Sequence, residues 1–363
     1  MSFFNFKKED LIRNNYFVFC IFTVIVFLFY GNTLQNGFVQ DDLGIIEKNV
    51  YIRSLDNLPK VVTGCLLEYV NKGCQGRIFY YRPIPYLSYF LTYQISPKPW
   101  VFHLANLFYF ILAGFLLFVL AKILTKNYFF ALLAAIIFLI HPVNSEAVNW
   151  IAAAADLLFA IFALLAAIFY VKYRSGNNSK NLISVYFFYF FALLSKETAI
   201  FFPLVAVSLD LFFFKISIQK AIRWRELKKY LAFALPLFLY FIMRVAVIGP
   251  GSYFGEFNLP ERVYATFALF AKYLGKLFYP HPLQVIYDFQ ISQDIFNFPF
   301  LFSAIILFLF LALFVFALKR QKGLVAFSLV WFAVFLSPVI IFLKAAGAGT
   351  GFFFERYLLV PSI

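Results

Sequence analysis

Charged residues are scarce in this sequence: Asp, Glu, Lys and Arg make up 13% of the 363 residues, whereas hydrophobic residues make up 63%. Soluble domains carry about a quarter charged residues, so the composition excludes an ordinary soluble protein. The apolar residues form repeated runs that are long enough to cross a membrane. The sequence therefore predicts an all-α polytopic membrane protein.

Cysteine and histidine are also rare, with three residues of each. They lack the spacing of a Cys/His metal site, and the sequence contains no Walker loop, no GxGxxG and no nucleophile–His–Asp arrangement. A soluble nucleotide-sugar site is therefore not supported. We expect no organic cofactor, and the residues leave dependence on a divalent metal open. Cys65 and Cys74 share one polar loop, where a disulfide and two free thiols both fit the sequence.

Basic residues outnumber acidic ones by 31 to 17, but their arrangement does not indicate nucleic acid as a partner. They form short clusters between the apolar runs, which is the pattern of positively charged cytoplasmic loops. With the N-terminus in the cytoplasm, the clusters at 122–126, 172–180 and 215–229 all lie on the cytoplasmic side. The first apolar run, 16–33, lacks a small-residue cleavage site, so we expect a retained anchor.

The apolar runs divide the chain into two parts. Residues 1–248 form a seven-helix module, with a polar loop at 34–98 on the outer side that carries an amphipathic piece at 86–93. Its predicted helices are 16–33, 100–121, 129–140, 147–171, 182–194, 199–214 and 230–248.

Residues 249–363 form the second part, with runs at 300–318 and 324–343. The stretch 264–279 carries Lys272 and Lys276 on one helical face, so we expect it to lie in the membrane interface or to be re-entrant. Another helix is expected to begin at Tyr357, so the fold is expected to continue past the C-terminal residue. The total is about ten to eleven membrane helices.

Asp41 and Asp42 follow the first predicted helix directly and have apolar neighbours. Carboxylates at a membrane edge are costly and typically functional. Two adjacent carboxylates resist joint ionisation, and poor hydration would raise the pKa of one of them, which suits a general base. The structural alternative is that Asp42 caps the helical sequence after it, and one aspartate can cap while the other acts.

The corner at 141–146, His-Pro-Val-Asn-Ser-Glu, lies on the same predicted face. Asn144 or Ser145 would cap the next helix, with Glu146 in its first turn. This explanation leaves His141 without a role, and a ligand contact by His141 or Glu146 fits equally well. Asp156 lies one to two turns into that helix, where it needs a cationic or hydrogen-bonding partner, in either a structural or a catalytic role.

Several cations are expected near these carboxylates. Lys196 and Glu197 end the short helix at 182–194, where they fit a self-neutralising surface pair or a phosphate-binding lysine. Arginine binds phosphate in a bidentate manner. The expected donor phosphate-binding residues are Lys196, Arg244 and Arg356, and the expected substrate pocket contains Arg82, His141, Glu146, Asp156, Glu197 and Glu355.

An ordered set of short motifs extends over nearly the whole chain and resembles the GT-C glycosyltransferases. The resemblance is strongest to the transmembrane-and-TPR O-mannosyltransferases and their bacterial relatives. The motifs are FVQDD at 38–42, RP at 82–83 with SY at 88–89, HLAN at 103–106, the run 131–140 into HPVNSE at 141–146, ADLL at 155–158, LSKET at 194–198 and ERYLLVP at 355–361.

The resemblance implies a GT-C-type helical bundle and a glycosyltransferase, with mannose as one candidate sugar. The donor would be a polyprenyl-phosphate-linked sugar, and Asp41 or Asp42 would be the general base in an inverting reaction. Transfer would take place on the periplasmic or lumenal face. Because the TPR repeats of many relatives are absent, both a protein and a glycan acceptor fit.

Two further expectations follow for the location and for the competing function. The bacterial inner membrane is expected rather than the endoplasmic reticulum, and membrane lipid is an expected partner. The alternative function is a transporter or flippase of lipid-linked sugars. Such a protein would show repeated halves or helices broken near the membrane centre, and neither is evident in the sequence.

Overall fold

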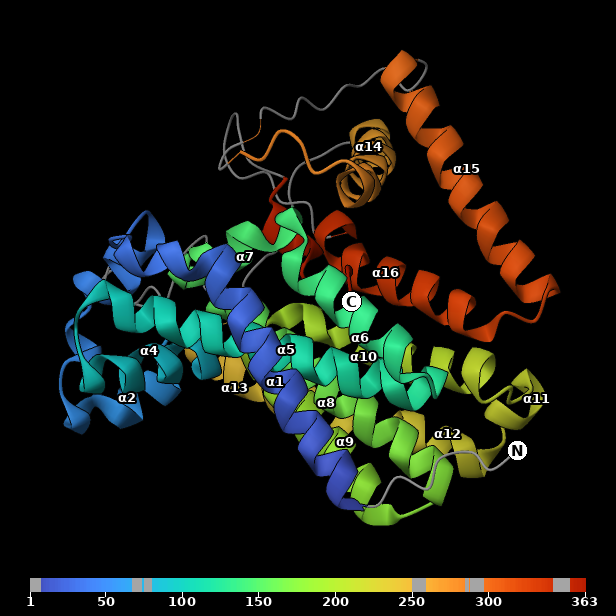
Figure 1. The fold of residues 1–363 in the computed structure, drawn as a ribbon, viewed down its shortest axis with the longest axis horizontal. Helices are drawn as coiled ribbons and strands as arrows, with labels where there is room; N and C mark the ends of the chain where they lie inside the picture. Colours follow the sequence, from blue (N-terminus) through green and yellow to red (C-terminus); the bar gives the residue numbers. More distant parts are fainter. Residues whose placement is uncertain are drawn as a thin grey trace.

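The computed structural model describes residues 8–66, 74, 80–249, 259–284, 287, 297–341 and 353–363. Helices are the only regular secondary structure in these ranges, and they pack as one bundle with α14, α15 and α16 on one flank (Figure 1). The prediction of an all-α polytopic membrane protein is confirmed.

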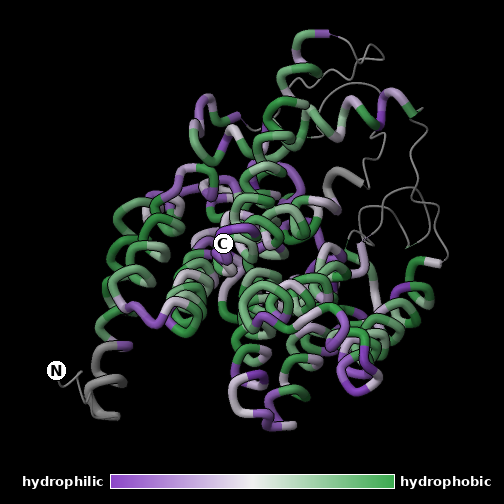
Figure 2. The backbone as a smooth tube through the Cα atoms, turned by 90° about the vertical axis from the view of Figure 1, so that its right-hand side faces the viewer, coloured by the Kyte–Doolittle hydropathy of each residue, from purple (hydrophilic) through white to green (hydrophobic). Residues whose placement is uncertain are grey.

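Five helical segments of the described chain are long and apolar enough to cross a membrane. The first, Asn15–Gln35, includes most of α1 (Lys8–Tyr30). The others contain α5 (Pro99–Thr125), α8 (Ala154–Gly176), α12 with α13 (Trp224–Leu231 and Ala234–Ile248) and α15 (Phe298–Lys319). A sixth is counted if α6 (Tyr128–Ile140) and the helical residues after it, bent by 53°, form one span. Hydrophobic residues follow these helices, and hydrophilic ones concentrate at turns (Figure 2).

The predicted count of ten to eleven membrane helices is higher than five or six. Two apolar helices, α9 (Ser179–Ser195) and α16 (Gly323–Ile341), are shorter than the others. The predicted helix 199–214 is divided into η7 (Glu197–Phe201), α10 (Phe202–Ser208) and η8 (Leu209–Phe213), which have 3₁₀, α and π geometry. The stretch at 264–279 forms α14 (Leu259–Phe278), which is not among the candidate spans.

Three further sequence predictions concern the amphipathic piece of the outer loop, the C-terminal residues and the division of the chain into two parts. The amphipathic piece at 86–93 lies in α4 (Pro83–Ile95), as predicted. In place of the expected helix from Tyr357, the structure has the 3₁₀ helix η9 (Glu355–Leu358) and then a turn. A boundary between two parts at residue 248 stays a prediction.

The predicted continuous helix 147–171 is wrong, because the chain is extended at Trp150 between α7 (Ser145–Asn149) and the 3₁₀ turn η6 (Ile151–Ala153) that leads into α8. Backbone carbonyl groups at the break lack helical hydrogen-bond partners, and side chains from other helices bind them instead. Asn106 donates to the Trp150 carbonyl at 3.0 Å, and the Tyr89 hydroxyl lies 3.3 and 3.2 Å from the Ile151 and Ala152 carbonyl oxygens.

Helix α8 is the centre of the bundle. In the hydrophobic stretch of the membrane-length segment that contains α8, 83% of the residues are buried, against 17% in the corresponding stretch of α15. Six of its buried residues are alanines, which allow α5 and α9 to approach closely. This packing holds both ends of α8 in place. A polar cluster lies at each end.

Different short helices lie at the two ends of the bundle (Figure 1). One end carries α4 and α2 (Leu58–Thr63) with the short helices η2 (Leu43–Glu47), η3 (Val50–Ile52) and η4 (Leu55–Asn57). A disulfide joins Cys65 and Cys74 there, which decides between the two alternatives left by the sequence. The other end carries α11 (Ile218–Ala221) and α12.

Gly323, the first residue of α16, approaches η8 so closely that a Cβ atom would overlap the Phe212 carbonyl oxygen. We expect Gly323→Ala to lower the free energy of unfolding by about 1–3 kcal/mol, since backbone must move to admit the methyl group. Gly176→Ala at the end of α8 is the matched control, because its Cβ meets open space. Denaturant unfolding in detergent measures both, and equal effects would contradict the expectation.

Candidate active site

The residues around Asp41 and Asp42, 38–42, form an acidic loop that is held against the break before α8. Asp42 Oδ1 accepts a hydrogen bond from the Ala152 backbone N–H at 2.8 Å, and Oδ2 accepts one from Val39 at 3.1 Å. Asp42 is itself in helical conformation and does not cap η2 through its side chain. The predicted capping role is therefore wrong. The carboxylate instead joins two segments that are 110 residues apart.

The two aspartates differ in exposure. Asp42 is fully buried, whereas Asp41 is exposed. Burial raises the pKa of Asp42 from its usual 3.8 to about 7, and the charge of Asp41 adds to this rise. The backbone N–H groups of Val39 and Ala152 oppose it. Asp42 is suited to position the loop, and Asp41 is free to meet a ligand.

The raised pKa of Asp42 predicts a pH-dependent stability. Between pH 4 and 7 the folded protein holds a proton that the unfolded chain releases, so stability falls as pH rises through about 7. Asp42→Asn removes this titration, and we expect a flatter curve of unfolding midpoint against pH. Glu47→Gln, an exposed acid in η2, is the control. An unchanged slope in Asp42→Asn would refute the assignment.

Glu146 binds the C-terminal segment to the same region. Its Oε2 accepts the Arg356 backbone N–H at 2.9 Å, and its Oε1 forms an ion pair with the Arg356 guanidinium. The guanidinium also lies 4.5 Å from the Trp150 ring centroid and 4.0 Å from that of Phe354. Because Trp150 precedes Ala152 by two residues, this cation lies close to the acidic loop.

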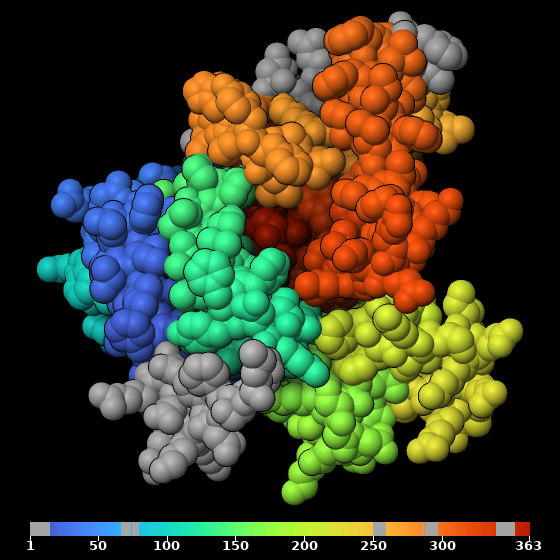
Figure 3. All heavy atoms as spheres, turned by 45° about the vertical axis from the view of Figure 1, so that its right-hand side comes forward, coloured from blue at the N-terminus to red at the C-terminus, as the bar shows by residue number. Residues whose placement is uncertain are grey.

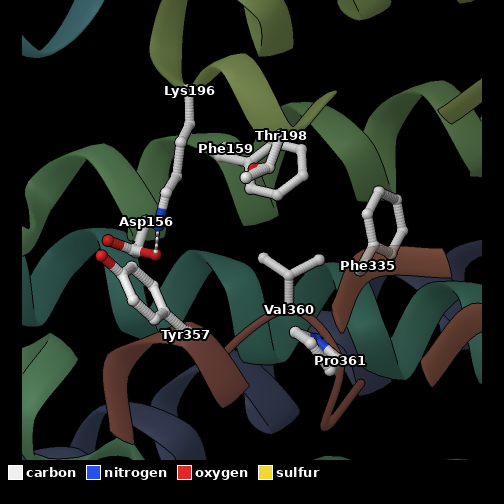
Figure 4. A pocket seen from close by; sticks show the side chains of 8 residues that line it. All are labelled: Asp156, Phe159, Lys196, Thr198, Phe335, Tyr357, Val360 and Pro361. Carbon is white, nitrogen blue, oxygen red and sulfur yellow. Dashed lines mark hydrogen bonds and ion pairs between the residues drawn. The ribbon is translucent and has the colours of Figure 1, made fainter. Parts of the chain in front are cut away.

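Lys196 and Glu197 do not pair with each other, so the predicted self-neutralising pair is wrong. Lys196 forms a buried ion pair with Asp156 (Figure 4), so of the two kinds of partner expected for this carboxylate, a cation or a hydrogen-bond donor, the structure shows a cation. Glu197 accepts two hydrogen bonds from Arg82, at 2.9 and 2.5 Å. Burial alone would raise the pKa of Glu197, but Arg82 lowers it to about 2, so the pair stays ionised.

A small cavity lies beside the Lys196–Asp156 pair. Lys196 Nζ is 4.6 Å from the Tyr357 ring centroid, and the buried Thr198 hydroxyl has no hydrogen-bond partner in the described part of the chain. The volume is about 10 Å³, roughly what one water requires. Its lining residues are Asp156, Phe159, Lys196, Thr198, Phe335, Tyr357, Val360 and Pro361.

The C-terminal residues enclose this region. Figure 3 shows them at the bottom of a hollow between α6 and α16. Trp331 of α16 donates to the Val360 carbonyl at 2.8 Å, and Leu358 and Leu359 are fully buried. The cavity has room for about one water, and Arg82, Lys196 and Arg356 each form an ion pair with a carboxylate.

His141 has a structural role at this corner. Its Nδ1 accepts the Val143 N–H at 3.2 Å, so the 3.0 Å contact of Nε2 with the Leu277 carbonyl requires a proton on Nε2. His141 thus caps the turn after α6 and binds the end of α14. The predicted capping side chains are wrong, because Asn144 donates to the Phe138 carbonyl and Ser145 lies inside α7.

Glu355 of η9 belongs to a neighbouring polar cluster that also includes Lys276 of α14. It accepts a hydrogen bond from the Tyr287 hydroxyl and lies 3.7 Å from Lys276 Nζ. Burial raises the pKa of Glu355. The sequence had placed Lys276 with Lys272 on one face of this helix without giving either a role. A lysine pair in the apolar stretch 264–279 was the signal for this contact.

Arg244 lies farther along α13, half-buried and one turn beyond Tyr240. The Tyr240 ring is 6.4 Å from that of Tyr81, next to Arg82 in the chain. Helical spacing puts Arg244 on the same side of α13 as Tyr240. The structure thus brings together Asp42, Arg82, Glu146, Asp156, Lys196, Glu197 and Arg356, with Asp41, Arg244 and Glu355 at their edge.

The sequence did not single out Trp150, Thr198 or Tyr357 as site residues. Trp150 and Tyr357 contact site cations through their rings, and an aromatic residue in a chain with 23 Tyr and 4 Trp carries no distinguishing signal. Among the described residues, no three His, Cys, Asp or Glu side chains are arranged to hold a metal ion.

The fold and the site define a multi-pass membrane protein with paired carboxylates and cations at one end of the bundle. The chain is 31% identical over 181 residues to the protein O-mannosyl-transferase Tmtc1 of Drosophila melanogaster, 33% over 148 residues to Tmtc2 of the same species, and 29% over 170 residues to TMTC3 of Mus musculus. It is therefore related to the TMTC protein O-mannosyl-transferases, as the motifs indicated.

These matches cover 49%, 38% and 45% of this chain, respectively, but only 21%, 15% and 16% of the relatives. The matched region thus spans about a fifth or less of those proteins. No family model matches the sequence. No solved structure gives a significant match to it.

Proposed function

We propose that this protein is a membrane glycosyltransferase that transfers a sugar, mannose in the first instance, from a polyprenyl-phosphate carrier to a hydroxyl group. The relatives, named protein O-mannosyl-transferases, support the reaction type and a protein hydroxyl as acceptor. The observation that carries the proposal is the Asp42–Ala152 hydrogen bond, because it fixes the acidic loop beside the segment whose Trp150 contacts Arg356.

In the proposed mechanism Asp41 is the general base. Its exposed carboxylate accepts the proton of the acceptor hydroxyl while the hydroxyl oxygen forms a bond to the anomeric carbon of the sugar. The bond from that carbon to the phosphate oxygen breaks, and polyprenyl phosphate leaves with the electron pair. Attack opposite to the leaving group inverts the anomeric configuration. Asp42 is a positioning residue, because it is buried and bonded to the backbone on both oxygens.

The departing phosphate gains negative charge, and preorganised cations stabilise such charge in a transition state. Lys196 and Arg356 serve this purpose in the proposal, with Arg244 at the approach along α13. Lys196 has three N–H donors and Arg356 has five in its guanidinium, so each can bind a phosphate oxygen and still contact its carboxylate. Because the cavity of about 10 Å³ is too small for a sugar phosphate, the proposal requires the residues that line it to move apart when the substrate binds.

Reconstitution in liposomes tests the function. The purified protein is given polyprenyl-phosphate mannose with a labelled sugar and a peptide rich in serine and threonine. Label on the peptide together with free polyprenyl phosphate supports the proposal, and a glycan acceptor in a parallel sample tests the second acceptor class. Movement of intact carrier across the bilayer without cleavage would show a flippase instead.

The sidedness of the site is a separate prediction. We propose that the end of the bundle with α2 and α4 faces the periplasm or the lumen. In a Cys20→Ser background, Lys48→Cys in the exposed part of that end is expected to react with a membrane-impermeant maleimide in intact cells. Lys126→Cys, in the turn between α5 and α6, is expected to react only after permeabilisation. The reverse pattern would invert the topology.

A further inference from the structure

The end of the bundle opposite the site contains a second polar cluster. Asp210 of η8 is fully buried and accepts hydrogen bonds from the hydroxyls of Tyr170 and Tyr230, at 2.7 and 2.5 Å. Arg174, at the end of α8, forms ion pairs with both Asp210 and Glu226 of α12. Because Arg174 is 18 residues beyond Asp156, the two clusters are separated by roughly 27 Å, close to the thickness of the bilayer core.

This cluster fixes one face of α12. Glu226 forms ion pairs with Arg174 and Lys229, each at 2.8 Å, and Tyr230 binds Asp210. Glu226, Lys229 and Tyr230 are three and four residues apart, so they share the side of the helix that faces the bundle. The opposite side of α12 is consequently presented outward.

The outward side of α11 and α12 combines large apolar residues with cations. Ile218, Ile222 and Trp224 are 69%, 65% and 63% exposed, and Leu231 is also exposed. Exposed basic residues alternate with them along the same segment. They are Lys215, Lys220, Arg223, Arg225 and Lys228. Glu226 is the only acidic residue from 211 to 233, and its ion pairs neutralise it.

Neither water nor the bilayer core suits such a surface alone. Exposed isoleucine and tryptophan disfavour full hydration, and the cations disfavour hydrocarbon, whereas the headgroup layer accommodates both. The length of the span agrees: Trp224–Ile248 has 25 residues, or roughly 37 Å of helix, and exceeds the core by about 7 Å. The first turns of α12 therefore lie among the headgroups.

We propose that α11 and α12 form a binding surface for anionic lipid headgroups in the leaflet opposite the site. The basic side chains contact headgroup phosphates, while Ile218, Ile222 and Trp224 insert between acyl chains at the boundary. The Asp210 cluster holds the surface in place. This inference does not depend on the proposed transferase activity.

The test uses the full-length protein in detergent micelles with equal amounts of phosphatidylglycerol and phosphatidylcholine, and native mass spectrometry counts the lipids that remain bound. Wild type is expected to prefer phosphatidylglycerol. Neutralising Lys220, Arg223, Arg225 and Lys228 to Gln is expected to lower that preference by about tenfold or more. High ammonium acetate is expected to weaken it in the wild type, a readout that does not rely on any variant folding.

The matched control neutralises four exposed cations away from α11 and α12: Lys48→Gln, Arg53→Gln, Lys98→Gln and Arg262→Gln. It has the same net charge change and is expected to keep most of the preference. An equal loss in this control, or full preference in the α11–α12 variant, would overturn the proposal. Binding of an oligo-glutamate peptide without any preference for phosphatidylglycerol would also overturn it, in favour of an acidic protein partner.

Discussion

Asp41→Asn is expected to lower the rate of sugar transfer by about 10²- to 10⁴-fold, the range that a general base contributes. The amide has the shape of the carboxylate but cannot accept the acceptor proton. Because Asp41 is exposed, the variant should keep the unfolding midpoint of the wild type. The measurement is initial transfer rate from polyprenyl-phosphate mannose at saturating acceptor, together with the midpoint of thermal unfolding.

Asp42→Asn distinguishes the proposed roles of the two aspartates. The Asp42 carboxylate now accepts hydrogen bonds from the backbone N–H groups of Val39 and Ala152. The NH₂ of an asparagine amide would face one of these two N–H groups, so one hydrogen bond would be lost and the loop would loosen. Both the free energy of unfolding and the rate of sugar transfer would therefore fall. Glu47→Gln controls for the loss of one negative charge at this end of the bundle. If Asp41→Asn is fully active while a folded Asp42→Asn is inactive, the base is Asp42 and the proposed division of roles is wrong.

The sequence was sufficient to predict that the candidate site residues lie together at one end of the bundle. The alternation of apolar runs and basic clusters determines which turns share a membrane face, and this places the acidic loop, the His-Pro corner and the Lys-Glu step together. It was also sufficient to expect a cation or a hydrogen-bond donor beside Asp156, since burying an unpaired carboxylate is costly. Both statements need only local pattern and topology.

The sequence did not predict which residues form ion pairs with each other. Lys196 is extended, with φ −155° and ψ 133°, and successive side chains of an extended chain point in opposite directions. Lys196 therefore reaches Asp156 on α8 while Glu197 reaches Arg82 at the start of α4. The break at Trp150 is also not evident from the sequence. Its alanine-rich surroundings favour a helix, and tertiary hydrogen bonds with Asn106, Tyr89 and Asp42 stabilise the break.

Lys196→Met is expected to destabilise the protein by about 3–5 kcal/mol, because it leaves the buried Asp156 carboxylate without its cation. Adding Asp156→Asn removes the uncompensated charge, so the double variant is expected to recover most of the lost stability. Lys48→Met, an exposed lysine at the same end of the bundle, is the control and is expected to change little. Denaturant unfolding in detergent gives the three free energies.

The same double variant distinguishes a structural from a catalytic lysine. If Lys196 only neutralises Asp156, transfer should return together with stability. If Lys196 stabilises the departing phosphate, as we propose, the refolded double variant should stay slow, since no cation replaces the ammonium beside Tyr357. Transfer rates measured where both proteins are fully folded decide between these outcomes, and recovered transfer would leave Arg356 as the remaining candidate for the phosphate.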